Sequence, residues 1–148
     1  MARIFIHFVQ FLLLLAFILG IWFRVQGMDR SLWLDEAWVA NSVLEPTVPQ
    51  MLFYDHWVPS PEPGFFLASR LVSKWLGPSN RSFRIVPVAF GLVGLIPMLL
   101  LLRRLFPPVW AAFGFALLSV SPDAITHSRN FKQYSAQLAA TPSFCWLL

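Results

Sequence analysis

Charged residues are scarce in this chain. Asp, Glu, Lys and Arg together make up 12% of its 148 residues, and only seven residues are acidic. Hydrophobic residues make up 57%. Soluble domains usually carry about 25% charged residues, so an ordinary soluble domain is excluded. A single cysteine, Cys145, excludes an internal disulfide and a cysteine-based metal cluster. The composition therefore predicts an integral membrane protein, with the lipid bilayer as a partner.

Several binding motifs are also missing. The chain has no glycine-rich phosphate loop and no His/Cys zinc spacing. Its net charge is +4, but the basic residues flank apolar runs and form no stripe, so we expect no nucleic-acid partner. The sequence requires no cofactor. Asp35 together with Asp55 or His56 could bind a divalent cation. The sequence spacing of these residues is not diagnostic of a metal site, so no metal is assigned.

Long uncharged runs are what the sequence has instead. Residues 4–23 match the roughly 20 residues that a helix needs to cross a bilayer. Arg3 ahead of this run would also suit a signal peptide, but no small-x-small cleavage site follows, which favours a retained anchor. Runs at 85–102 and 105–122 flank the pair Arg103-Arg104 and predict a helical hairpin. Pro107-Pro108 suits the start of its second helix.

A fourth apolar run, 134–148, ends with the chain and is too short for a full span. The predicted fold is thus an all-α membrane protein with three transmembrane helices and a truncated fourth. The loop 24–84 is expected to hold interfacial amphipathic helices, one of them at residues 65–76. Arg103-Arg104 and the amino terminus are assigned to the cytoplasm by the positive-inside rule, which puts this loop outside.

An acidic pair, Asp35 and Glu36, lies between Trp33 and Trp38 just after the first run. Ser31 is expected to cap a helix over 32–44, with both acids in its first turn. Successive helical residues point about 100° apart, so one carboxylate can face a reactant while the other supports it. The alternative is that both acids only stabilise the helix end.

The segment 121–135 leaves the third span and enters the fourth run. Arg129 and Lys132 are three residues apart and are expected to share a helix face, where two cations would suit a phosphate. The alternative is that they contact lipid headgroups. The proline-rich loop 45–63 carries His56, which is a candidate ligand or base, or a surface residue.

Five short motifs occur in the order seen in GT-C membrane glycosyltransferases. They are Leu32-Trp33-Leu34-Asp35-Glu36-Ala37; Pro61-Glu62-Pro63-Gly64-Phe65-Phe66-Leu67; Leu76-Gly77-Pro78-Ser79 with Phe83-Arg84-Ile85-Val86-Pro87; Arg103-Arg104-Leu105-Phe106; and His127-Ser128-Arg129 through Lys132-Gln133-Tyr134-Ser135. The chain resembles the amino-terminal part of the bacterial family related to protein O-mannosyltransferases and lipid A aminoarabinose transferases. The doubled proline frequent in relatives is here Pro61-Glu62-Pro63-Gly64.

This resemblance implies a transferase that moves a sugar from a polyprenyl-phosphate donor to an acceptor hydroxyl on the outer face of the bacterial inner membrane. Asp35 would be the general base and Glu36 its neighbour. Arg129 and Lys132 would hold the carrier phosphate, and Tyr134 would bind at the same site. Two other classes stay open: a non-catalytic membrane protein, as remnant or partner subunit, and a small transporter. The transporter would need ionisable groups inside the spans, where the sequence offers little polarity.

Overall fold

The computed structural model describes residues 2–53 and 62–147, and within these ranges it is all helical, with no strand. The described helices are α1 (Ala2–Val25), α2 (Leu34–Leu44), α3 (Val48–Leu52), α4 (Pro63–Leu76), α5 (Asn80–Val93), α6 (Leu95–Leu105), α7 (Pro108–Ser119), α8 (Pro122–Arg129) and α9 (Tyr134–Leu147). The all-helical class predicted from the sequence is confirmed for these residues.

Two stretches are long and apolar enough to cross a membrane: Ile4–Val25, which is most of α1, and Asn80–Leu105, which joins α5 to α6. The second begins five residues before the predicted run at 85, because the capped turn at Ser79 starts the helix early and includes Arg81 and Arg84. The predicted run 105–122 is divided. Its helix α7 stops at Ser119, and α8 follows at an angle of 51°. The helices α7 and α8 amount to a third membrane span only if the bent pair is counted as a single span.

Prolines and glycines explain where these helices break. α5 gives way to α6 at Gly94, and the next proline, Pro97, cannot donate to the carbonyl four residues earlier and crowds it. Pro122 likewise opens α8 after the turn that ends α7. The helix α7 begins at Pro108, as predicted, with Pro107 as its N-cap.

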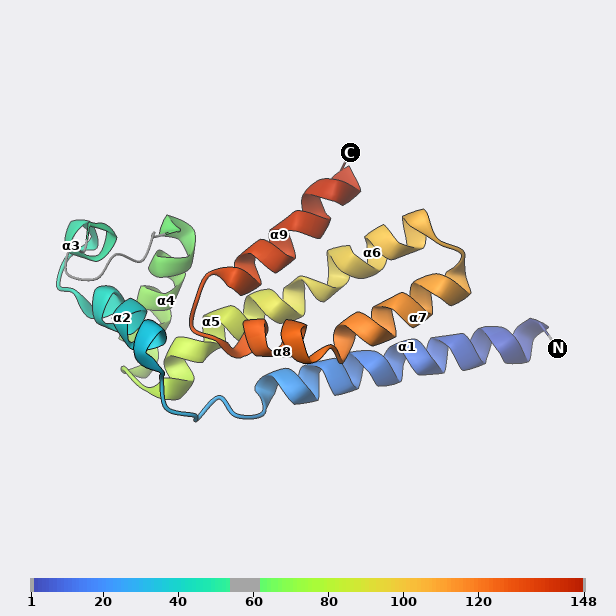
Figure 1. Cartoon of the computed structure of the whole chain (residues 1–148), viewed down its shortest axis with the longest axis horizontal. Helices are drawn as coiled ribbons and strands as arrows, with labels where there is room; N and C mark the ends of the chain where they lie inside the picture. The colour runs from blue at the N-terminus through green and yellow to red at the C-terminus, as the bar shows by residue number, and fades with distance from the viewer. Residues whose placement is uncertain (1, 54–61, 148) are drawn as a thin grey trace.

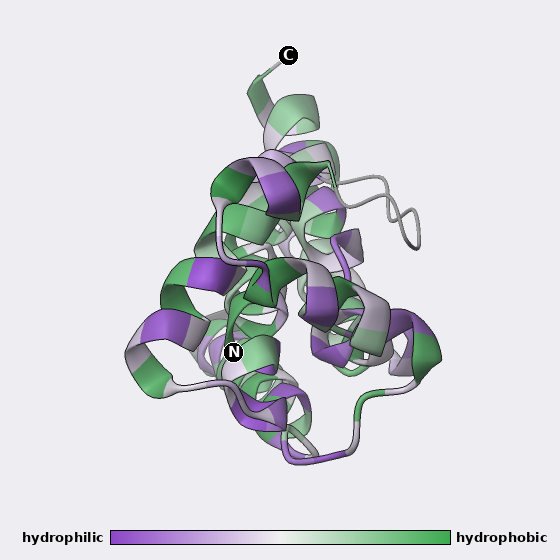
Figure 2. Cartoon of the chain, turned by 90° about the vertical axis from the view of Figure 1, so that its left-hand side faces the viewer, coloured by the Kyte–Doolittle hydropathy of each residue, from purple (hydrophilic) through white to green (hydrophobic). Residues whose placement is uncertain are grey.

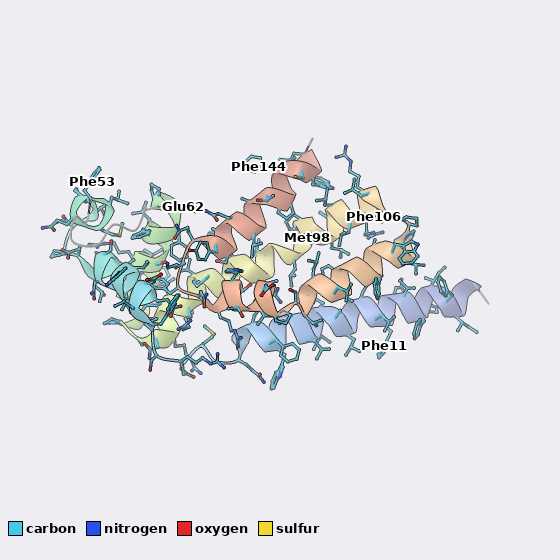
Figure 3. The ribbon with its side chains drawn as sticks, in the orientation of Figure 1. Phe11, Phe53, Glu62, Met98, Phe106 and Phe144 are labelled. Atoms are coloured by element: carbon cyan, nitrogen blue, oxygen red, sulfur yellow. The ribbon has the colours of Figure 1, made fainter. Side chains whose placement is uncertain are left out.

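The long helices lie side by side (Figure 1). α1 packs along α7, α7 along α6, and α6 along α9, so that the hairpin predicted around Arg103-Arg104 is present. The outer faces are apolar. Phe11 on α1 is 59% exposed and points away from the bundle (Figure 3). Exposed phenylalanines of this kind suit contact with lipid chains.

The helices α2, α3 and α4 gather at the end of the bundle opposite the start of α1 (Figure 1). They enclose a core with the start of α5 and with Phe131, whose ring lies 5.0 Å from Phe83 and 5.6 Å from Phe65. Viewed from this end, hydrophilic and hydrophobic residues alternate along the ribbon (Figure 2). The apolar residues of the predicted interfacial helices thus contribute to a protein core. At α2, Ala40 is buried in this core, whereas Trp33 and Leu44 are exposed.

The predicted loop 45–63 contains a short helix, α3, which the sequence reading did not anticipate. Thr47 accepts a hydrogen bond from the backbone N–H of Gln50 and so caps it.

Arg70 of α4 is buried near the end of α2 rather than directed to lipid headgroups. Its guanidinium donates to the carbonyls of Val43, Glu45 and Pro46, where α2 ends. This arginine therefore satisfies carbonyl groups that a helix end leaves without partners.

Candidate functional site

The acidic pair lies at the start of α2, but its local geometry differs from the prediction. Trp33, not Ser31, is the N-cap residue, and the cap is made by Glu36, whose Oε2 accepts from the backbone N–H of Trp33 at 3.2 Å. Ser31 is exposed. A glutamate at the third helical position commonly reaches back in this way. Because Glu36 turns inward to do so, Asp35 points elsewhere.

Glu36 is buried, with 1% of its surface exposed, and is held by Arg84 of α5. Arg84 Nη1 donates to Glu36 Oε1 at 2.9 Å, and Nη2 donates to Oε2 at 2.8 Å. Such a two-pronged pair is the strongest arrangement that an arginine and a carboxylate form. The backbone N–H of Phe131 also donates to Oε1 at 2.5 Å. Glu36 therefore joins α2, α5 and the segment between α8 and α9.

Arg84 extends this network through backbone carbonyls. It donates to the carbonyl oxygen of Ser31 at 3.3 Å and to that of Arg129. Its Nε is buried and has no partner among the described residues. A charge taken out of water needs this many partners, because its desolvation otherwise costs several kcal/mol. We call Glu36, Arg84 and the backbone of Phe131 the buried clamp.

Asp35 and Lys132 meet at the edge of the clamp. Lys132 Nζ donates to Asp35 Oδ2 at 2.8 Å, across 97 positions of sequence. The side chain of Asp35 is 35% exposed and that of Lys132 is 19% exposed. The surroundings of the two acids differ: Glu36 is enclosed, whereas the side chain of Asp35 is partly exposed.

Aromatic rings surround the ammonium group of Lys132. It lies 6.0 Å from the centre of the Trp33 ring and 5.7 Å from that of Tyr134, both within range of a cation–π interaction. Burial alone lowers the pKa of Lys132, but the hydrogen bond and negative charge of Asp35, together with Tyr134, raise it, and the net shift is upward. Lys132 is therefore held in its charged form.

Arg129 does not share a helix face with Lys132, and that prediction is wrong. Arg129 is the last residue of α8, and its side chain donates to the carbonyl of Gln26 at 3.1 Å, whereas Lys132 lies in the non-helical segment before α9. The two cations diverge because the helix ends between them.

Tyr134 opens α9 and borders a pocket of about 350 Å³ between α6, α8 and α9. Its ring meets that of His127 edge-on, at 5.4 Å between centres. Met98 of α6 is part of the lining and lies on the side of α6 toward α9 (Figure 3). Gln137, also in the lining, donates to Glu62 at 2.8 Å and so connects α9 to the start of α4. This pocket is lined by apolar and polar side chains, and Tyr134 connects it to Lys132.

The remaining candidates concern metal binding. His56 and Asp55 lie outside the described residues. Within the described ranges, no three His, Cys, Asp or Glu side chains come together to hold a metal ion.

Sequence reasoning missed Arg84 and Phe131, the partners of Glu36. Arg84 carried a signal, since it is a charged residue at the edge of an apolar run, where charge is costly unless it is paired. Phe131 contributes its backbone N–H, and a backbone group has no signature in sequence.

Comparison of the chain with protein-family models, with curated proteins and with solved structures found no match.

Proposed function

We propose that this chain is a membrane glycosyltransferase, or part of one, that moves a sugar from a polyprenyl-phosphate donor to an acceptor hydroxyl. The observation that carries the proposal is the Asp35–Lys132 pair, a partly exposed carboxylate and ammonium held at one end of the apolar helices. Sequence resemblance to GT-C transferases adds the donor class.

Each group of the pair has a place in such a transfer. The bond between the sugar C1 and the phosphate oxygen breaks, and a bond between C1 and the acceptor oxygen forms. Asp35 takes the acceptor proton, and the phosphate leaves with the electron pair. Lys132 would release Asp35 and pair with the donor phosphate instead. The Asp35 carboxylate is then free to act as the base, and the ammonium group stabilises the negative charge on the leaving phosphate.

A second candidate is a non-catalytic membrane protein. One observation favours it: Lys132 Nζ and Asp35 Oδ2 form an ion pair at 2.8 Å, so each charge has a partner within the protein. The pair would then only join α2 to the segment before α9.

The test is a donor assay with the chain in lipid nanodiscs. Released polyprenyl phosphate is measured by mass spectrometry over a panel of polyprenyl-phosphate sugars. A positioned base contributes about 10²- to 10⁴-fold, so we expect Asp35→Asn to lower the release rate by that factor. Asp29→Asn is the matched control, since Asp29 pairs with Arg81 in an exposed contact and neither residue lines the pocket.

Binding of the donor separates the two candidates. We expect Lys132→Met to weaken binding of polyprenyl phosphate at least tenfold, while Lys74→Met, at an exposed position of α4, leaves it unchanged. A chain that neither binds polyprenyl phosphate nor releases it from any donor would support the non-catalytic candidate.

A further inference from the structure

Arg24 is the one arginine at the end of the first apolar helix, and it faces into the protein. It is 2% exposed, and its guanidinium lies where α1 meets α7 and α8. Nη1 donates to the carbonyls of Gly20 at 3.0 Å and Ser119 at 2.7 Å, and Nε donates to Ser128 Oγ at 3.2 Å. These contacts use three of the five N–H donors of an arginine.

The charge of Arg24 has no counterpart in the described part of the chain. The ion pairs found there join Asp29 to Arg81, Glu36 to Arg84 and Asp35 to Lys132. Its three acceptors are neutral oxygens, and Nη2 makes no hydrogen bond to a described residue. A buried cation without a carboxylate partner is costly, and an ionisable residue of this kind in a membrane helix suggests a binding role.

A small cavity adjoins this guanidinium. Its volume is about 70 Å³, and Arg24 and Ser128 supply charged and hydroxyl groups to a wall that is otherwise apolar, with Phe90, Leu95, Leu118 and Leu138. Cavities that are wholly apolar stay empty, whereas a cation in the wall favours a polar or anionic occupant. The volume suits one small ion with little or no hydration shell.

We infer that this cavity binds a small monovalent anion of the chloride class beside Arg24. An anion there would pair with the free side of the guanidinium and neutralise it in a low-dielectric setting. A phosphate dianion fits poorly, because a largely apolar wall offers few donors for four oxygens and two charges. This inference does not rest on the transferase proposal, since neither Asp35 nor Lys132 belongs to the cavity.

The first experiment compares thermal unfolding of the purified chain in sodium chloride, bromide and nitrate with that in sodium gluconate at equal ionic strength. At a chloride concentration ten times the dissociation constant, binding to the folded state alone raises the folded-to-unfolded ratio about 11-fold. We expect a rise in Tm of roughly 3–6 °C with the three small anions and none with gluconate.

Arg24→Gln should abolish this rise, and Arg103→Gln, at an exposed arginine of α6, should preserve it. Crystals of the unaltered protein grown in bromide provide a second measurement that does not depend on the folding of a variant. An anomalous peak beside Arg24 is the expected result. Water alone in the cavity, equal Tm in chloride and gluconate, or stabilisation by millimolar phosphate in gluconate would each overturn the inference.

Discussion

At the scale of single residues, the adjacent carboxylates Asp35 and Glu36 have opposite environments. Glu36 is fully enclosed and is bound by Arg84 and by the backbone N–H groups of Trp33 and Phe131, whereas Asp35 meets Lys132 at the surface. Their separation follows from the helix, which turns neighbouring side chains about 100° apart. Burial thus distinguishes a structural carboxylate from one that a ligand can reach.

The buried clamp makes a stability prediction. Glu36→Gln leaves Arg84 charged without its counter-ion, and removing one partner of a buried pair usually costs about 3–5 kcal/mol. We expect a loss of that size in chemical denaturation of the chain in detergent. Asp29→Asn, in an exposed pair with Arg81, should change stability by less than about 0.5 kcal/mol. Equal effects of the two substitutions would contradict a special role for the clamp.

The Asp35–Lys132 pair makes a prediction about alkaline pH. The folded-state pKa of Lys132 lies above its usual 10.5, so the ammonium form stabilises the fold. This contribution is fully present from neutral pH up to about the unfolded pKa and is lost as pH rises through the higher folded pKa. Because the pair is partly exposed, its size is about 0.2–1 kcal/mol. The unfolding free energies of the unaltered chain and Lys132→Met should therefore differ at pH 8 and converge at strongly alkaline pH.

At the scale of elements, α5 depends on glycine where it meets α8. A Cβ atom added at Gly91 would lie 2.2 Å from Ser128 Oγ and 2.5 Å from its Cβ, so the two helices would have to separate. Small residues allow this close approach between apolar helices, where packing rather than burial holds them together.

Gly91→Ala should accordingly cost about 1–3 kcal/mol, because it overpacks the contact between α5 and α8. Gly64→Ala in α4 is the matched control, since no atom lies within 4 Å of its added Cβ. Alanine there should be neutral or slightly stabilising through its helix propensity. Thermal unfolding of both variants in one detergent measures the difference, and a stable Gly91→Ala variant would mean that the helices can shift apart freely.

For the whole molecule, the two ends differ in chemistry. α2–α4, the clamp and the Asp35–Lys132 pair lie at one end, and the start of α1 and the turn between α6 and α7 lie at the other (Figure 1). We expect a membrane to separate these ends, with Arg103 and Arg104 on the cytoplasmic side.

Cysteine labelling measures this orientation. In a Cys145→Ser background, Asn41→Cys at an exposed position of α2 should react with a membrane-impermeant maleimide in right-side-out vesicles. Arg104→Cys should react only in inverted vesicles. Labelling of both positions from one side would contradict the topology, and labelling with the sides exchanged would reverse the orientation.

Sequence alone was enough for the helical class, the first span, the hairpin around Arg103-Arg104 and the proline that begins α7. These features depend on neighbouring residues in the sequence: an uninterrupted apolar run, a basic pair, and a proline, which has no backbone N–H to donate. The bend between α7 and α8 was missed, since a continuous apolar pattern does not reveal that a helix stops at Ser119.

The pairing of charges required the packed chain. Glu36 meets Arg84 across 48 positions and Asp35 meets Lys132 across 97, and nothing local distinguishes these partners from the other cations. Both contacts form because α2 packs against α4 and α4 against α5, while Phe131 enters the same core. The sequence identifies the two carboxylates, but long-range packing decides that Glu36 is buried and that Asp35 is partly exposed.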